Sequence, residues 1–238
     1  ARLEFPSPLR RVRPKPVFSR FAYVVVRAMH VGARLLLGLR VAGREHLPDS
    51  GTFILSPNHQ SYLDAFLLVG ALPYRTFRRL FFVGASEYFE TPFTRRLAQL
   101  MNVVPVDPDA NLLRAMQAGA FGLRRDLVLT LFPEGERSPD GAPKRFKQGA
   151  AITALQARVP IVPVALHGLF EIWPRGAGLR VGALMPWART RCAIRFGRPV
   201  PPESSSGEGA RRYDRHTELV RSAVVEMWEE LERERTRP

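Results

Sequence analysis

Residues 58–64, Asn-His-Gln-Ser-Tyr-Leu-Asp, constrain this chain more than any other stretch. They lie between an apolar run at 52–55, which predicts a strand, and an apolar run at 65–72, which predicts a helix. A strand that leads through a short turn into a helix places polar side chains at the carboxyl edge of a sheet, where open α/β folds bind their ligands. We therefore expect His59 at such an edge. Asp64 follows closely enough for its carboxylate to orient the imidazole and raise its basicity, as a general base requires.

The same residues also fit a purely structural pattern. Ser-x-x-Asp before an apolar run is a capping box, in which Ser61 is the N-cap and Asp64 lies in the first turn. That alternative leaves His59 unexplained. A second motif is needed to decide between structure and chemistry.

The second motif is Phe-Pro-Glu-Gly-Glu-Arg-Ser at 132–138, which follows a strand-like apolar run at 127–131. Turns that leave two buried parallel strands meet at one edge of the sheet. In the first motif, four residues separate His59 from Asp64. Together with the 132–138 motif, this spacing makes the chain resemble the glycerolipid acyltransferase family of the lysophosphatidate acyltransferase type. The resemblance covers roughly residues 40–200.

This resemblance implies a single-domain α/β fold with a mostly parallel central sheet flanked by helices. It implies that His59 and Asp64 are the catalytic pair of an O-acyltransferase and that the Glu-Gly-x-Arg turn holds the acceptor, a lysophospholipid or lysophosphatidate. The acyl donor would be a thioester of coenzyme A or of acyl carrier protein, and no metal or further cofactor is expected. The residues predicted to bind substrate are Asn58, Ser61, Glu134, Gly135, Arg137, Ser138 and Lys147.

The chemistry of the side chains suggests individual roles. Arg137 suits the acceptor's phosphate because a guanidinium fork matches phosphate better than an ammonium does. Glu134 would shape its turn by hydrogen bonding, and Gly135 by allowing an unusual backbone angle. Lys147 precedes a predicted helix at 150–157, where it either binds a phosphate or is a solvated loop lysine.

Two alternatives remain open. Ser61 activated by His59 would make a serine-type lipid hydrolase, although the Gly-x-Ser-x-Gly elbow is absent. The second alternative is an inactive, basic membrane-binding scaffold. The presence of His59, Asp64, Glu134 and Arg137 argues against it. A metal site is not expected, because His59 and Asp64 are too few ligands and no second His lies at ligand spacing.

The formal charge of +14 is carried almost wholly by arginine and favours a polyanionic partner. Zinc ligands, an aromatic RNA-binding signature and a basic-plus-heptad pattern are all missing, so we expect no nucleic acid and instead a membrane phospholipid surface. No apolar run reaches the roughly 18 residues of a spanning helix. The family resemblance implies a peripheral or monotopic protein that works at the cytoplasmic face of a membrane. The single cysteine, Cys192, excludes an internal disulfide and suggests a reducing compartment.

Three segments are expected: a basic, proline-rich stretch at 1–16, an amphipathic helix at 17–39 that either lies in a membrane interface or packs on the core, and an acyltransferase domain at 40–238. His167 is expected in a loop, and Trp173 and Trp187 either form a lipid-facing rim or pack in the core. Further strands are predicted at 80–83, 102–106, 159–164 and 191–200, and further helices at 91–101, 111–125 and 212–235.

One position departs from the family pattern. Pro108 stands about where the family has an arginine that contacts the acceptor's phosphate. The run Val-Pro-Val-Asp-Pro at 104–108 is more similar to the acyltransferase part of proteins fused to an acyl-activating enzyme. This argues against lysophosphatidate as the acceptor and predicts acyl carrier protein, or a fused or partner acyl-activating domain, as a partner. A chain that begins at Ala1 rather than Met is expected of such a fusion.

Overall fold

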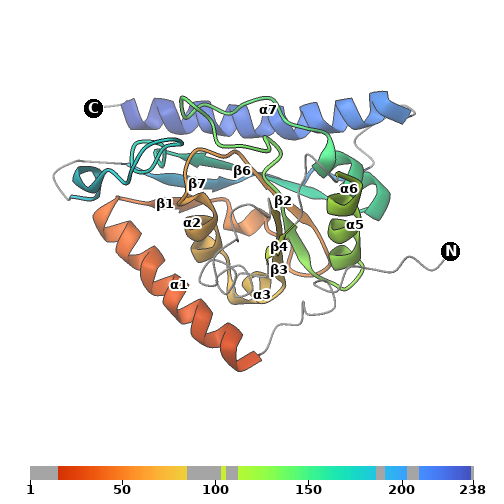
Figure 1. Cartoon of the computed structure of the whole chain (residues 1–238), viewed down its shortest axis with the longest axis horizontal. Helices are drawn as coiled ribbons and strands as arrows, with labels where there is room; N and C mark the ends of the chain where they lie inside the picture. Colours follow the sequence, from red (N-terminus) through yellow and green to blue (C-terminus); the bar gives the residue numbers. More distant parts are fainter. Residues whose placement is uncertain (1–15, 85–102, 106–111, 186–190, 203–208, 237–238) are drawn as a thin grey trace.

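The computed structural model describes residues 16–84, 103–105, 112–185, 191–202 and 209–236. In these ranges the strands form a seven-stranded sheet in the order β1-β7-β6-β2-β5-β3-β4 (Figure 1). Only the β6–β7 pair is antiparallel among these strands, which confirms the predicted mostly parallel sheet. The strands are β1 Arg40–Ala42, β2 Ile54–Pro57, β3 Leu80–Gly84, β4 Val103–Pro105, β5 Val128–Thr130, β6 Ile161–His167 and β7 Ala193–Phe196.

Helices cover both faces of the sheet, because the strands are apolar on both faces. In β2, Leu55 packs in a core cluster with α1 and α2, whereas its neighbour Ile54 packs in a cluster with α5, α6 and α7. Successive side chains of a strand point to opposite faces, so the domain has three layers (Figure 1). The helices are α1 Pro16–Leu36, α2 Asp64–Ala71, α3 Tyr74–Phe77, α5 Leu112–Leu123, α6 Gly149–Ala157 and α7 Gly209–Thr236, with single 3-10 turns η2 Arg44–His46 and η4 Val181–Leu184.

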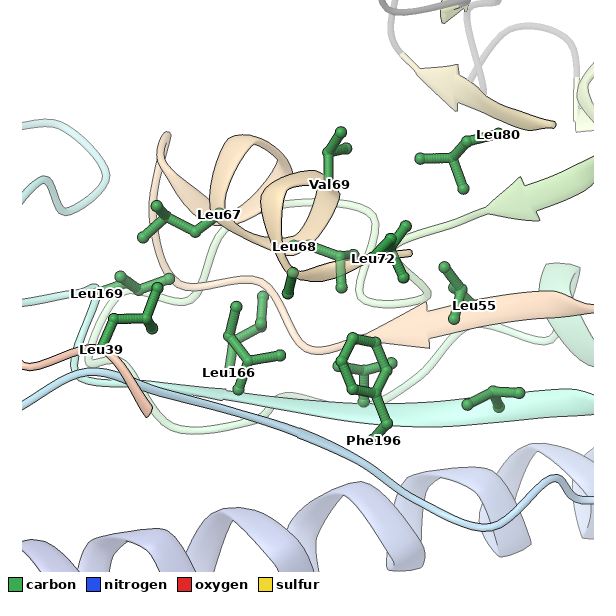
Figure 2. Close-up of a cluster of buried hydrophobic side chains, with 14 of the residues drawn as sticks. Leu39, Leu55, Leu67, Leu68, Val69, Leu72, Leu80, Leu166, Leu169 and Phe196 are labelled. Atoms are coloured by element: carbon green, nitrogen blue, oxygen red, sulfur yellow. The ribbon is translucent and has the colours of Figure 1, made fainter. Parts of the chain in front are cut away.

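The core beneath α2 fixes the position of this helix. Leu68 and Leu72 pack toward Leu55, Leu166 and Phe196, and all five side chains are completely buried (Figure 2). Full burial of such a side chain contributes about 1.5–3 kcal/mol. The first turn of α2, where Asp64 lies, is therefore anchored to the sheet.

The amino-terminal segment differs from the prediction in two respects. The helix ends at Leu36 rather than at residue 39, because Gly38 adopts a φ of 57°, a left-handed conformation that terminates helices. Residues 40–42, for which the sequence analysis predicted no strand, form β1 and pair with β7. Ala33 and Leu37 are buried in the core, so α1 packs on the domain, and other side chains of α1 stay exposed.

Most remaining elements appear with boundaries shifted by a few residues. The strand expected at 52–55 is β2 at 54–57, and the one expected at 191–200 is limited to 193–196. The predicted helix at 91–101, residues 1–15, Pro108 and Trp187 lie outside the described residues. Within the part that is described, we find no helix with the length and apolarity needed to cross a bilayer.

Candidate active site

The predicted contact between His59 and Asp64 is present. His59 Nδ1 lies 2.7 Å from Asp64 Oδ2, and Asp64 is completely buried. An ionised carboxylate only accepts hydrogen bonds, so the imidazole hydrogen belongs on Nδ1 and the lone pair on Nε2. The His59 side chain is 18% exposed, and Nε2 has no hydrogen bond to any described residue. The pair therefore presents a basic nitrogen to solvent or to a substrate.

The Asp64 carboxylate also organises the turn that carries His59. Its Oδ2 accepts the backbone N–H groups of Gln60, at 2.6 Å, and of Ser61, at 2.8 Å. This is the reciprocal half of a capping box. The other half is absent, because the Ser61 hydroxyl accepts the Leu63 N–H and caps nothing within α2, whose N-cap residue is Leu63. The prediction of Ser61 as the helix cap is therefore wrong.

The two sequence motifs are joined through the backbone of His59. Its N–H donates to Glu134 Oε1 at 3.0 Å, and its carbonyl accepts the Ser138 N–H at 2.7 Å. The imidazole stacks on Phe132, with ring centroids 4.1 Å apart. Because β2 and β5 are parallel neighbours, the turns that leave them meet at the same edge, as predicted.

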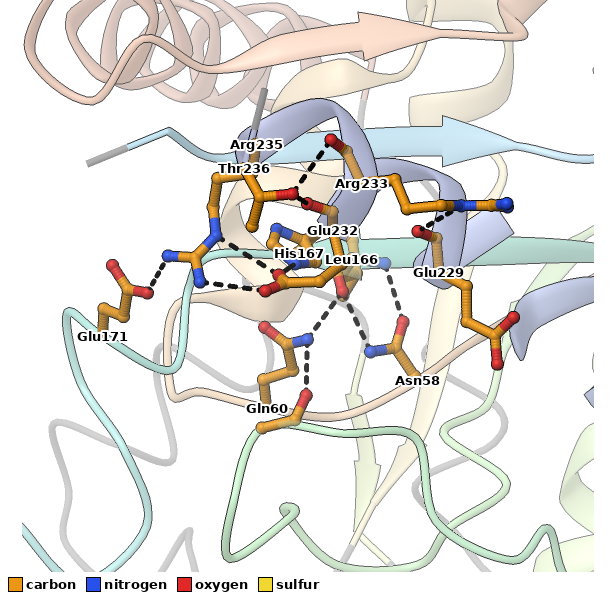
Figure 3. A network of polar contacts seen from close by, with 11 residues as sticks. Asn58, Gln60, Leu166, His167, Glu171, Glu229, Glu232, Arg233, Arg235 and Thr236 are labelled. Atoms are coloured by element: carbon orange, nitrogen blue, oxygen red, sulfur yellow. Dashed lines mark hydrogen bonds and ion pairs between the residues drawn. The ribbon is translucent and has the colours of Figure 1, made fainter. Parts of the chain in front are cut away.

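Two side chains of the turn bind it to β6 (Figure 3). The amide of Asn58 donates to the Leu166 carbonyl at 3.0 Å and accepts the Leu166 N–H at 2.7 Å. Gln60 Nε2 donates to the same carbonyl and to that of Gly141. Asn58 was predicted to bind substrate, but it is completely buried and used on β6, so in this structure it holds the turn in place. The sequence analysis missed Gln60, whose partners lie 81 and 106 residues away.

The turn at 134–137 has the features expected of its residues. Glu134 is buried and forms the predicted hydrogen bond. Gly135 has a φ of 79°, a left-handed backbone angle that favours glycine, and a Cβ there would lie 2.8 Å from Lys147 Nζ. Lys147 thus lies directly over this turn. Glu136 is exposed and pairs with Lys144 and Arg175.

An aromatic group that the sequence analysis did not identify positions Arg137. Its guanidinium carbon lies 3.6 Å from the centroid of the Tyr62 ring, which in turn contacts the Trp173 ring at 4.9 Å. Stacking of this kind orients a guanidinium without using its N–H donors. Ser138, predicted to bind substrate, is buried; its hydroxyl donates to Asp140 Oδ1 and accepts the Gly141 N–H, so it shapes the loop.

The serine-nucleophile alternative lacks its base. The Ser61 hydroxyl donates to the Trp173 carbonyl at 2.9 Å and is buried, and it makes no hydrogen bond to His59 within the described structure. His59 Nδ1 is already engaged by Asp64. A nucleophile and its base must be within hydrogen-bond reach, so this geometry does not support a Ser–His pair.

His167 is the last residue of β6 and not a loop residue, which corrects the prediction. It is buried, and its Nε2 lies 2.6 Å from Glu232 Oε2 of α7. Arg235 links Glu232 to Glu171 (Figure 3). Burial lowers the pKa of His167, and Glu232 partly opposes this effect. His167 therefore ties α7 to the sheet. Among the described residues no group of three or more His, Cys, Asp or Glu side chains is placed to hold a metal ion.

Burial raises the pKa of Glu134 to about 7, and the N–H groups of His59 and Lys144 oppose this shift. Its ordinary pKa is 4.5, so the folded protein binds an extra proton between these values and its free energy of unfolding falls as pH rises through this interval. Gln at 134 keeps the acceptor for the His59 N–H without the charge. We expect Glu134→Gln to gain stability relative to wild type as pH rises, by a few kcal/mol at most.

Urea denaturation of wild type and Glu134→Gln below pH 4.5 and above pH 7 measures this difference. Glu136→Gln is the matched control, because Glu136 is exposed two residues further on. If the difference in free energy of unfolding between Glu134→Gln and wild type were equal at both pH values, Glu134 would have the same pKa in the folded and the unfolded protein.

A three-layer α/β domain with a histidine–carboxylate pair at the carboxyl edge of a parallel sheet defines the class of this protein. The family model described as acyltransferase matches residues 38–167. That is more than half of the chain, and the chain therefore belongs to the acyltransferase family.

Individual relatives agree with this assignment. The chain is 33% identical over 146 residues to the chloroplastic 1-acyl-sn-glycerol-3-phosphate acyltransferase LPAT1 of Arabidopsis thaliana, a match that covers 58% of this chain and 38% of that protein. It is 27% identical over 226 residues to the 1-acyl-sn-glycerol-3-phosphate acyltransferase of Pseudomonas aeruginosa, with 91% and 80% covered. The crystal structure of the 1-acyl-sn-glycerophosphate acyltransferase PlsC of Thermotoga maritima has the same fold, with a TM-score of 0.71 and 24% identity over 90% of this chain and 81% of that one.

Proposed function

We propose that this chain transfers an acyl group from an acyl thioester to the free hydroxyl of a lysophospholipid. The observation that carries the proposal is the His59–Asp64 pair, with Nδ1 held at 2.7 Å and Nε2 without a partner among the described residues. Nε2 takes the proton of the acceptor hydroxyl while the hydroxyl oxygen attacks the thioester carbonyl carbon. The carbon–sulfur bond then breaks, and the thiolate leaves and recovers the proton from the imidazolium. No acyl-enzyme is required.

The acceptor that we propose is lysophosphatidate. The relatives are 1-acyl-sn-glycerol-3-phosphate acyltransferases by name, which supports this acceptor, whereas the run at 104–108 favours a larger head group. Arg137 belongs to the turn that adjoins His59 and Lys147 lies over this turn, where a guanidinium and an ammonium suit a phosphate monoester. The donor is a thioester of coenzyme A or of acyl carrier protein, and the transfer experiment described below distinguishes the two.

Peripheral binding to the cytoplasmic face of a membrane is part of this proposal. Helix α1 exposes large apolar side chains, including Phe21 at 66% and Leu35 at 79%. An amphipathic helix with basic residues beside such a face suits the interface of an anionic bilayer. A lysophospholipid acceptor dissolves in the same interface, so the acceptor would reach the enzyme without leaving the membrane.

Transfer of a labelled acyl chain tests the proposal. Acyl-coenzyme A and acyl carrier protein are each supplied with lysophosphatidate and with lysophosphatidylcholine, using wild type, Arg137→Gln and Arg124→Gln. Arg124 is exposed and lies at the opposite edge of the sheet, before β5 begins, so it controls for charge. We expect transfer to lysophosphatidate, with the KM for this acceptor raised only in Arg137→Gln. Transfer only to lysophosphatidylcholine would overturn the proposed acceptor, and absence of any transfer would overturn the activity.

A further inference from the structure

A polar stripe of α1 lies away from the His59–Asp64 pair. Tyr23, Arg27, His30 and Arg34 recur at intervals of three or four residues and so share one side of the helix. Arg27 Nη1 donates to the Gly70 carbonyl at 2.9 Å. The Tyr23 hydroxyl donates to the Leu72 carbonyl, directly after α2, at 3.4 Å. The stripe therefore adjoins the last turn of α2.

Arg44 of η2 lies close enough to Arg27 and Arg34 for their charges to act on it. Its Nε and Nη2 atoms are inaccessible to solvent and have no hydrogen-bond partner in the described part of the chain. Burial lowers the pKa of its guanidinium, and the charges of Arg27 and Arg34 lower it further. Across the described ranges, no carboxylate forms an ion pair with Arg27, Arg34 or Arg44.

His30 lies among these three arginines. It is 1% exposed, and neither ring nitrogen forms a hydrogen bond to a described residue. Burial lowers the pKa of His30 to about 4, and the charges of Arg27, Arg44 and Arg34 contribute, whereas the Leu67 carbonyl opposes the shift. The imidazole is therefore neutral in a region that already carries three positive charges.

Such an arrangement is incomplete without an anion. Partly buried like charges destabilise a fold, and a guanidinium whose N–H donors lack acceptors loses the hydrogen bonds that it makes in water. Arginine forks match the oxygens of a phosphate group. The exposed apolar side chains of α1, such as Phe21 and Leu35, would hold this helix at a membrane surface, where headgroup phosphates can reach the exposed Arg34.

We propose that Arg27, Arg34 and Arg44 form a binding site for a phosphate group, separate from the catalytic pair. Asp64 begins α2 and Gly70 lies in its last turn, so the two places are roughly 9 Å apart along the helix axis. The group is the headgroup phosphate of an anionic phospholipid or a free phosphate ion. The site does not depend on acyl transfer, and His59→Ala is expected to retain it.

The test compares two double variants with the same change in net charge. Arg34→Gln/Arg44→Gln alters the proposed site. The control, Arg124→Gln/Arg233→Gln, removes two exposed arginines elsewhere: Arg124 directly follows α5, and Arg233 lies in α7. Each protein is sedimented with phosphatidylcholine vesicles with and without phosphatidylglycerol. In parallel, its melting temperature is measured in inorganic phosphate and in chloride at equal ionic strength. His59→Ala is run beside them, so that loss of catalysis and loss of the site are distinguished.

With a lipid phosphate as ligand, the Arg34/Arg44 variant should bind anionic vesicles about 25-fold more weakly than wild type, because each cation near an anionic surface contributes about fivefold. The control should change far less. With a free phosphate as ligand, phosphate should raise the melting temperature of wild type, His59→Ala and the control, but not that of the Arg34/Arg44 variant. Equal behaviour of the two double variants in both assays would overturn the site. Arg34→Gln alone, at an exposed position, repeats the comparison if the double variant does not fold.

Discussion

Replacement of His59 by Ala is expected to lower kcat by roughly 10²- to 10⁴-fold, the usual contribution of a general base. The imidazole is partly exposed, its Nε2 has no hydrogen bond to a residue in the described ranges, and its partner Asp64 is completely buried. The measurement is single-turnover transfer of a labelled acyl chain at saturating acceptor. KM for the acceptor should change little, because the proposed phosphate ligands Arg137 and Lys147 are untouched.

Ser61→Ala is the matched control for His59→Ala. Ser61 is two residues away and buried, and its hydroxyl donates to the Trp173 carbonyl and accepts the Leu63 N–H, so its removal costs these two hydrogen bonds without touching His59. Activity should be retained after folding is verified by circular dichroism. A variant lacking Ser61 that is as inactive as His59→Ala would favour a serine nucleophile, and a His59→Ala variant as active as wild type would show that His59 is not the general base.

Substitution of Asp64 is expected to produce the second large effect, on both activity and stability. In Asp64→Asn, an amide hydrogen can face Nδ1, which moves the imidazole hydrogen to Nε2 and removes the base; a loss of roughly 10²- to 10⁴-fold in kcat follows. In Asp64→Ala, the buried N–H groups of Gln60 and Ser61 lose their acceptor. The free energy of unfolding should then fall by about 2–5 kcal/mol.

Asp140 offers a matched control for Asp64. Its carboxylate also accepts hydrogen bonds within a loop, from the Ser138 hydroxyl and the Ala142 N–H, but it is exposed. Urea denaturation and acyl transfer are measured for Asp64→Asn, Asp64→Ala and Asp140→Asn. If Asp64→Asn retained wild-type kcat, the carboxylate would not set the tautomer of His59, and its role would be limited to holding the turn.

The two motifs could be identified from the sequence because each is local. His59 and Asp64 are five residues apart, and Glu134, Gly135 and Arg137 belong to one turn. The apolar runs that precede the motifs predicted β2 and β5 within two residues. Strands of this kind signal a buried parallel sheet through their composition alone. The mostly parallel fold and the convergence of the motifs at one edge followed from these observations.

Other features have no local signal, because their partners are distant in sequence. Asn58 binds Leu166 across 108 residues, and Ser61 binds Trp173 across 112. Their types, Asn and Ser, also suit substrate binding and helix capping, so the sequence analysis assigned them those roles. Only the packing of β6 and of the loop after it against the turn decides which hydrogen bonds they make.

The chain's sequence alone therefore determined its α/β class, its two motifs and the amphipathic character of its first helix. The tertiary structure decided that β1 pairs with β7, that His167 ends a strand instead of lying in a loop, and that Arg44 joins Arg27 and Arg34. Hydrophobic periodicity and turn chemistry depend on neighbours within a few residues, so a sequence displays them directly. Strand order and the grouping of like charges depend on how distant segments pack. A three-residue strand such as β1 is also too short for its sequence pattern to indicate which strand it pairs with.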